Sequence, residues 1–404
     1  MKIAIIGGGA SGMVTAYLLN KKDHNVTVLE KQPILGGHIR TLNKNVKPNQ
    51  SDSNQFLEAG VLEFPDNFYN FRELMKDLDV ELEPVEVGSA IFWQNGHHLF
   101  SGLMIQNNFI GIQRVIEQLK LNTLYASSAA LWVRSHFAQR QDLYNQSLSQ
   151  YLNCQSIRND WIKLLTMYCY SIPFELIDNV PAELVIPVLQ NYVFVKWLRI
   201  KGGVYSYIEK IRERFQGEIL LNIDVAEIYR QSDSVQIRLS DGENYLFDKV
   251  VFATPPDQVI QLLSDSTKDE IKWFSAWQKN QAKTVIHTDT SMYARSGIKE
   301  YSEFDFFQTH KGWGYNAYLN RLCAISLSPA YSLAFKLDHL IAEEKIIHIQ
   351  EHHTPLYTVE SFRYRNEIVM TNGENNTYHA GAYLSDGLHE GAITSAIRVA
   401  ELIR

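Results

Sequence analysis

The first thirty residues constrain the fold more than any other stretch of the chain. Lys2 to Ile6 is a short apolar run typical of a buried parallel strand, and it runs directly into the six small residues of 7–12. A helix is expected over 13–22 and a second strand over 25–30. A glycine-rich turn between a strand and a helix, inside a unit of about 30 residues, is typical of dinucleotide-binding folds.

The individual residues of this turn fit that interpretation. Gly7 allows a tight turn, and Gly9 lets the backbone approach a pyrophosphate. Gly12 lets helix and strand pack closely, while the N–H groups at the helix start, at Ala10 and Ser11, can hold negative phosphates. Glu30 closes the second strand, where a carboxylate accepts hydrogen bonds from ribose hydroxyls. The alternative is a glycine-rich turn that arose by chance.

A second glycine pair follows shortly after Glu30. Gly36 and Gly37 would let a loop fold over the diphosphate, and Arg40 would add positive charge to it. Lys31 follows Glu30 in the sequence and is also expected to contact the cofactor. NAD-dependent dehydrogenases do not need this second loop, so its presence favours FAD over NAD.

Composition excludes several other classes of protein. The chain has 404 residues and a net charge of −7 without a dense basic run, which argues against a nucleic-acid partner. Its three cysteines, Cys154, Cys169 and Cys323, are far apart, so we expect no metal site and no disulfide framework, and we expect all three to be buried. The same cysteine pattern fits the reducing cytoplasm, which is the expected location. No window of 18 apolar residues is present, so no membrane-spanning segment is expected, with membrane-surface contact left open.

The order of the predicted elements indicates two interleaved domains. The predicted fold class is α/β: a Rossmann-like domain with a parallel sheet, interleaved with a mixed-sheet and helical substrate domain. The cofactor domain is expected at 1–80, 202–265 and 365–404, and the substrate domain at 81–201 and 266–364. Long helical patterns rich in aromatic residues predict a helical insertion at about 104–200.

Several motifs together resemble the FAD-dependent amine oxidase superfamily. The second glycine pair is similar to that family's second glycine motif, and the segment NIDVAEIY (222–229) resembles the stretch in which a valine, here Val225, binds adenine through its backbone. The segment at 378–403 resembles the C-terminal signature, a strand end followed by a helix whose N-terminus would stabilise negative charge on the flavin. Further segments resemble a bacterial amine-oxidase-like branch. The resemblance implies non-covalent FAD, with Gly60, Gly381, Asp386, Leu388 and Gly391 among its contacts.

Two side chains are candidate catalytic residues. The position of Lys283 in the segment KTVIHTDT resembles that of the family's lysine, which holds a water at flavin N5; the alternative is an exposed lysine at a strand end. His389 precedes the last helix near the expected flavin ring and could hydrogen-bond to a substrate or to the ring. The adjacent pairs His97–His98 and His352–His353 are expected in exposed loops.

One departure from the family pattern bears on the substrate. Amine oxidases flank the flavin with two aromatic rings, and the position equivalent to the second ring is Leu388. Tyr315, Tyr318, Tyr383 and Trp313 are candidates for another aromatic wall, or for the core. The aromatic-rich insertion predicts an apolar pocket and hence a hydrophobic small-molecule substrate, although these residues could equally pack the insertion.

The sequence therefore predicts an FAD-dependent oxidoreductase that transfers hydride from a C–N or C–C bond of a largely apolar small molecule to flavin N5. The alternatives are a lipid- or isoprenoid-directed flavin desaturase or isomerase, a catalytically inactive flavin-binding protein, and an NAD-dependent dehydrogenase. The electron acceptor and the oligomeric state are left open.

Overall fold

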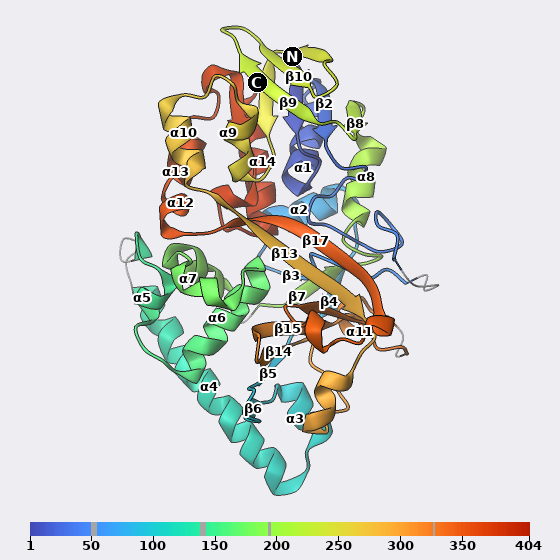
Figure 1. Ribbon diagram of the computed structural model, residues 1–404, viewed down its shortest axis with the longest axis vertical. Helices are drawn as coiled ribbons and strands as arrows, with labels where there is room; N and C mark the ends of the chain where they lie inside the picture. Colours follow the sequence, from blue (N-terminus) through green and yellow to red (C-terminus); the bar gives the residue numbers. More distant parts are fainter. Residues whose placement is uncertain (50–54, 138–142, 193–194, 326–327) are drawn as a thin grey trace.

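A five-stranded parallel sheet forms the upper half of the molecule in Figure 1. The computed structural model describes residues 1–49, 55–137, 143–192, 195–325 and 328–404. The strand order is β18 (Thr377–His379), β12 (Lys249–Phe252), β1 (Lys2–Ile6), β2 (Asn25–Glu30) and β8 (Glu218–Leu221). Ile3 to Ile6 are all buried, as expected for a strand covered on both faces.

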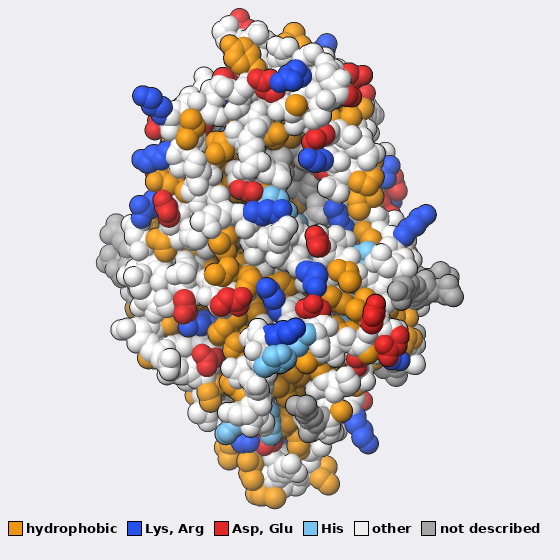
Figure 2. All heavy atoms as spheres, viewed as in Figure 1, with side chains coloured by type: hydrophobic (Ala, Val, Ile, Leu, Met, Phe, Trp, Pro, Cys, Tyr) orange, Lys and Arg blue, Asp and Glu red, His pale blue; other side chains and the backbone are white. Residues whose placement is uncertain are grey.

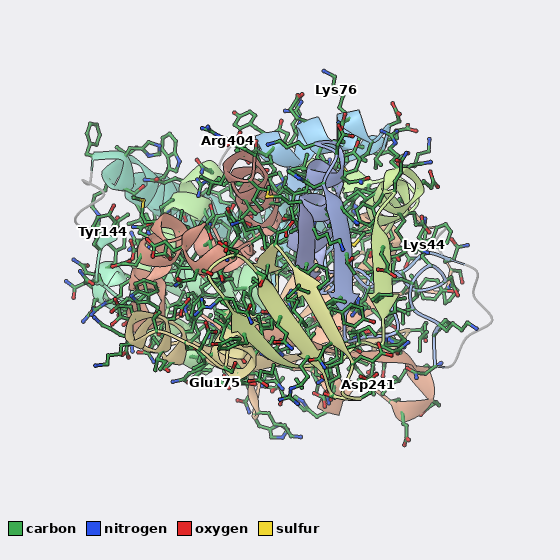
Figure 3. All side chains as sticks on the ribbon, turned by 90° about the horizontal axis from the view of Figure 1, so that it is seen from above. Lys44, Lys76, Tyr144, Glu175, Asp241 and Arg404 are labelled. Atoms are coloured by element: carbon green, nitrogen blue, oxygen red, sulfur yellow. The ribbon has the colours of Figure 1, made fainter. Side chains whose placement is uncertain are left out.

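Two different layers cover this sheet. Ile3 and Ile5 pack with α1 (Ala10–Asn20), α8 (Ser206–Arg214) and α14 (His389–Leu402) on one face. Ala4 and Ile6 lie on the other face, in a cluster shared with β9 (Val225–Arg230), β10 (Val235–Leu239) and β11 (Asn244–Phe247). Figure 3 shows the result, with Arg404 and Asp241 on opposite sides of the sheet.

A mixed seven-stranded sheet forms a second layer system below the first (Figure 1). Most of its neighbouring strands are antiparallel, whereas β14 and β5 are parallel. Its order is β17 (Ile346–Leu356), β13 (Gln278–His287), β16 (Ser332–Phe335), β15 (Gly312–Tyr318), β14 (Phe304–Thr309), β5 (Ser89–Phe92) and β6 (His98–Leu99). A small sheet of β3 (Phe64–Pro65), β7 (Trp197–Ile200) and β4 (Leu82–Val85) lies between the two large ones.

Helices make up most of the described part of 102–191, as the sequence predicts. They are α3 (Gly102–Asn108), α4 (Gly111–Phe137), α5 (Leu148–Leu152), α6 (Ile157–Tyr170) and α7 (Ala182–Asn191). The other helices are α2 (Tyr69–Asp77), α9 (Val259–Leu262), α10 (Lys268–Ser275), α11 (Leu319–Leu322), α12 (Val359–Arg363) and α13 (Arg365–Met370). No described helix is long and apolar enough to cross a membrane.

The predicted fold class is confirmed, and strands from three separate stretches of chain build the parallel sheet. The bounds of the two domains stay a prediction. The sequence did not predict β16 and β17, and the helix expected within 378–403 is α14, which begins at His389. The expectation of three buried cysteines is wrong, because Cys154 is exposed and Cys169 and Cys323 are only partly buried.

Candidate functional site

A cavity of about 1110 Å³ runs between the parallel sheet, the mixed sheet and the helical region. Its volume exceeds the roughly 1,000 Å³ at the upper end of pockets that hold one drug-sized ligand. It therefore has room for a cofactor and a second molecule. The wall includes Gly7, Gly9, Ala10, Ser11, Glu30, Lys31, Gly36, Gly37, Arg40, Gly60, Val225, Gly381, Leu388 and His389, each of which the sequence singled out.

The first glycine turn forms one end of this cavity. Gly7 has a φ of +107°, and a Cβ there would lie 2.8 Å from the carbonyl oxygen of Ala253. A Cβ on Gly12 would lie 1.9 Å from the carbonyl oxygen of Gly7, so only glycine fits, although Gly12 itself does not line the cavity. Gly9 is the N-cap of α1 and faces the cavity with its backbone. The free N–H groups at the start of α1 thus adjoin the open space.

Glu30 fixes the shape of this turn as well as lining the cavity. Its Oε2 accepts a hydrogen bond of 2.6 Å from the N–H of Gly8, and its Oε1 accepts one of 2.7 Å from the N–H of Gln32. Each carboxylate oxygen has a further lone pair for an external hydroxyl donor. Lys31 pairs with Asp224 at 2.9 Å, so its charge is partly compensated within the protein.

The second glycine pair lies directly against the first turn. The N–H of Gly36 donates to the carbonyl oxygen of Gly8 at 2.8 Å, and Gly36 and Gly37 have φ values of +113° and +58°. Arg40 is buried and donates to the carbonyl oxygen of Ile39 at 3.1 Å. Burial lowers the pKa of the Arg40 guanidinium from its ordinary value, and the structure describes no carboxylate at ion-pair distance from it. A buried cation on the cavity wall suits a phosphate.

The C-terminal signature forms another part of the wall. Gly381, Leu388 and His389 line the cavity, whereas Asp386 and Gly391 lie behind it. Oδ1 of Asp386 accepts hydrogen bonds from the N–H groups of Leu388 (2.8 Å) and Gly391 (2.9 Å). Burial raises the pKa of Asp386 to about 6. The expected contacts of Asp386 and Gly391 with the cofactor stay predictions; in the structure, both residues shape the start of α14.

His389 is a neutral imidazole in the wall. Its Nε2 lies 2.8 Å from the hydroxyl of Tyr207, and its ring packs against Phe64 and Phe71. Burial lowers the pKa of His389 to about 4. A neutral ring whose Nε2 is held by Tyr207 keeps a fixed orientation at the first turn of α14.

The structure does not bring Lys283 to the cavity. Its Nζ pairs with Asp338 at 2.8 Å, and about half of each side chain is exposed. The next residue, Thr284, does line the wall and donates from its hydroxyl to the carbonyl oxygen of Ala59 at 2.7 Å. Successive residues of a strand point to opposite faces, and here the side chain at 284 is buried whereas the side chain at 283 is exposed.

We call the wall formed by Gly7, Gly9, Glu30, Gly36, Arg40, Val225 and Leu388 the cofactor cradle. The same cavity continues into an aromatic chamber, which we define by Leu165, Tyr168, Tyr192, Phe304 and Tyr315. Tyr168 stacks on Phe304 with ring centroids 4.1 Å apart and meets Tyr315 edge-on at 5.0 Å. Of the four aromatic residues proposed from sequence, Tyr315 and Tyr383 line the wall, whereas Trp313 and Tyr318 do not. Cys169 also lines the chamber, and burial raises the pKa of its thiol to about 12.

The sequence analysis missed Glu63, which also lies in the chamber wall. Its Oε1 accepts a hydrogen bond of 2.7 Å from the hydroxyl of Tyr168, and its Oε2 has no partner among the described residues. Burial raises the pKa of Glu63 to about 7. The only sequence signal was a single carboxylate inside the apolar segment VLEFP.

The expectation that His352 and His353 lie in an exposed loop is wrong. Both belong to β17 and line the cavity. Nε2 of His352 lies 2.9 Å from the carbonyl oxygen of Ala59, and burial lowers the pKa of His352 to about 3. Nε2 of His353 lies 2.9 Å from a carboxylate oxygen of Asp257.

Comparison with known proteins agrees with this geometry. The family model of flavin-containing amine oxidoreductases matches residues 10–287. An L-amino-acid oxidase from Echis ocellatus is 32% identical over 80 residues, which are 20% of this chain and 15% of that protein. An L-amino-acid oxidase from Crotalus adamanteus is 31% identical over 92 residues, 23% of this chain and 16% of that protein.

Two solved structures show the same fold over the whole chain. A putrescine oxidase variant matches with a TM-score of 0.70 and 15% identity, covering 100% of this chain and 98% of that one. A fatty acid isomerase from P. acnes, described as producing CLA, matches with a TM-score of 0.67 and 18% identity over the same shares. The chain belongs to the flavin-containing amine oxidoreductase family.

Proposed function

We propose that this protein is an FAD-dependent oxidoreductase that oxidises a C–N or C–C bond of a largely apolar small molecule, taking hydride from a carbon of that bond and a proton from its neighbour. The observation that carries the proposal is the single cavity that continues from the glycine turn at Gly7 to the aromatic chamber beside Glu63. A cofactor cradle and a substrate chamber in one space are what a reaction between two bound molecules requires.

The residues of the cradle fit a dinucleotide that carries a diphosphate. The start of α1 and the buried Arg40 would hold the diphosphate, and Glu30 would accept the ribose hydroxyls. Val225 would meet the adenine, and Leu388 would lie beside the ring system at the start of α14. Bound flavin would supply the hydride acceptor, which the amino-acid side chains lack.

The chamber residues would bind the substrate and accept a proton from it. Tyr168, Phe304 and Tyr315 give an apolar wall that excludes water. Glu63, whose pKa of about 7 lets it exist in both protonation states near neutral pH, would take a proton from the reacting group. The neutral His389 would hydrogen-bond to the substrate or the ring edge.

The second candidate is a flavin-dependent desaturase or isomerase that acts on a lipid or isoprenoid. It is favoured by the apolar chamber, by Leu388 in place of an aromatic ring, and by the shared fold of a fatty acid isomerase. A catalytically inactive flavin-binding protein remains the alternative from another class.

The test is an anaerobic titration of the purified protein followed by visible absorbance. We expect a yellow preparation whose flavin bands bleach with a hydrophobic amine. Bleaching by an unsaturated fatty acid with no response to amines, or isomerisation of that fatty acid without net bleaching, would favour the second candidate. A yellow protein that neither is bleached by any substrate nor converts one would favour the inactive binder. A colourless preparation that binds NADH would refute the proposal that the cofactor is FAD.

The same preparation tests how the flavin is held. We propose non-covalent binding, in a cytoplasmic protein with a small-molecule substrate. The nearby thiol of Cys169 stays protonated at neutral pH and is a poor nucleophile. Acid precipitation should therefore leave the yellow colour in the supernatant, whereas a yellow pellet would indicate a covalent link.

A further inference from the structure

The lower end of the molecule carries a group of exposed apolar side chains (Figure 2). They lie on the α3–α4 connection and on the first turns of α4. We define the apolar tip as Ile110, Ile112, Val115, Ile116 and Leu119, of which Ile110 is 88% exposed and Ile112 is 75% exposed. Every residue from Ile110 to Ile116 is exposed, although about half of Val115 and of Ile116 is covered.

The apolar side chains face away from the body of the protein. At about 100° per residue, Ile112, Val115, Ile116 and Leu119 fall within an arc of about 100° on α4. Leu121 and Leu124, which anchor the helix, are buried and fall on the opposite side. This pattern reverses that of an ordinary surface helix, whose apolar stripe faces the core.

The chain segment that carries the apolar tip holds more basic than acidic residues. From Val87 to Phe137 the sequence holds one carboxylate, Glu117, which is buried and pairs with Lys120 at 2.8 Å. The same stretch also contains Arg114 and Arg134. A basic segment in a chain with a net charge of −7 marks this end as the part of the surface that an anionic partner would meet.

We propose that the apolar tip inserts into the surface of a lipid bilayer that contains anionic headgroups. An apolar helix face beside basic residues is the pattern of helices that lie in a membrane interface. The tip lies at the end of the long axis of the molecule, so it can enter a membrane surface without the rest of the protein following (Figure 1). Two turns of one helix fall well short of the about 800 Å² per partner that a stable protein interface buries.

The inference is independent of the proposed reaction, because vesicle binding is measured without substrate. The full-length protein is mixed with vesicles of phosphatidylcholine, with or without phosphatidylglycerol, and bound protein is separated by flotation. We expect binding to the anionic vesicles that weakens as salt is added. Absence of binding to anionic vesicles at low salt would overturn the proposal.

Matched variants tie the binding to the apolar tip. The double variant Ile112→Ser, Ile116→Ser should weaken binding by about tenfold or more, because two aliphatic side chains no longer leave water. Met370→Ser is the control, since Met370 is 81% exposed but lies on α13, far along the chain from the tip. Equal binding by the double variant and the control would refute the assignment.

Two further measurements separate a bilayer from a second copy of the chain. Ile112→Trp should shift its fluorescence to shorter wavelength when anionic vesicles are added, and an unchanged spectrum would contradict insertion. Light scattering without vesicles should give a monomer over the working concentration range. A dimer that the double Ser variant abolishes would show that the apolar tip is a protein interface instead.

Discussion

The hydroxyl of Tyr168 donates a hydrogen bond of 2.7 Å to Oε1 of Glu63 inside the chamber wall. These two residues lie 105 positions apart in the chain, one beside β3 and the other on α6. Tyr168 stabilises one carboxylate oxygen, while burial disfavours the charge on the whole group. Glu63 is thus the side chain in the chamber best suited to exchange a proton near neutral pH.

Replacing Glu63 with Gln should remove this proton exchange. The pKa of Glu63 is about 7, so kcat/KM of the wild-type enzyme should rise as pH increases through about 7, when the carboxylate forms. In Glu63→Gln this inflection should be absent, and kcat/KM above it should fall by about a hundredfold, the usual effect of losing a general base. The measurement is a pH profile on both proteins, with the flavin spectrum as the control for cofactor binding. An unaltered profile would exclude Glu63 from the reaction.

Glu63→Gln should also change how stability depends on pH. Because the pKa of Glu63 is raised in the folded state, its folded form binds more protons than the unfolded chain between about pH 4.5 and 7. The stability that it contributes is present below this window and is lost as pH rises through it. At about pH 8 the Gln variant should therefore be more stable than the wild type, by on the order of 2 kcal/mol, and near pH 4 the two should be equal. Thermal melts at both pH values test this.

Two glycines of the first turn should respond differently to alanine. A Cβ on Gly9 meets no atom closer than 3.6 Å, whereas a Cβ on Gly12 would lie 1.9 Å from the carbonyl oxygen of Gly7. Gly9→Ala should leave the unfolding free energy nearly unchanged, whereas Gly12→Ala should lower it by about 1–3 kcal/mol. Gly9→Trp should abolish flavin retention, because the ring would fill the cradle. Visible absorbance after gel filtration measures flavin retention, and a separate denaturant titration measures the unfolding free energy.

Lys283 should be dispensable for the reaction of reduced flavin with O2. Lys283→Met removes an exposed pair with Asp338, so the cost should be about 0–1 kcal/mol with unchanged reoxidation in stopped flow. Thr284→Val is the matched variant on the inward face, where it leaves the carbonyl oxygen of Ala59 with one donor fewer. Slower reoxidation in Lys283→Met alone would restore the role expected from the family pattern.

Buried histidines should make the protein sensitive to acid. Burial lowers the pKa of His379 to about 4, whereas in the unfolded chain it protonates near 6.5. Between these values the unfolded state binds one proton more, so the stability is present above the window and lost as pH falls through it. His379→Phe should flatten this dependence by about 1.4 kcal/mol per pH unit. Denaturant titrations across the window measure it, with His97→Phe, at an exposed position, as the control.

Local features of the sequence predicted much of the cofactor cradle. The glycine turn, Glu30 and the second glycine pair lie within 40 residues, and each signal depends on backbone geometry that neighbouring residues dictate. The start of α14 was recognisable for the same reason. These elements form a continuous part of the cavity wall, although the cofactor contacts themselves stay predictions.

The chamber was harder to predict because its contacts are distant in sequence. Glu63 gains its role only when α6 brings Tyr168 to it. Lys283 shows the sensitivity of strands, since a shift of one residue decides which side chain faces inward. The strand β17 was missed because IIHIQEHHTPL lacks an apolar alternation; its polar residues face the cavity, so the usual signal of a half-buried strand is absent.

The pairing of α1 with α14 brings the two ends of the chain together at the glycine turn. During synthesis the glycine turn before α1 therefore leaves the ribosome long before the residues of α14 that pack on it. A nascent chain that stalls, or a product clipped before His389, would therefore lack part of the cradle. Cofactor loading would thus depend on the presence of α14 and would separate molecules that contain this helix from those that lack it.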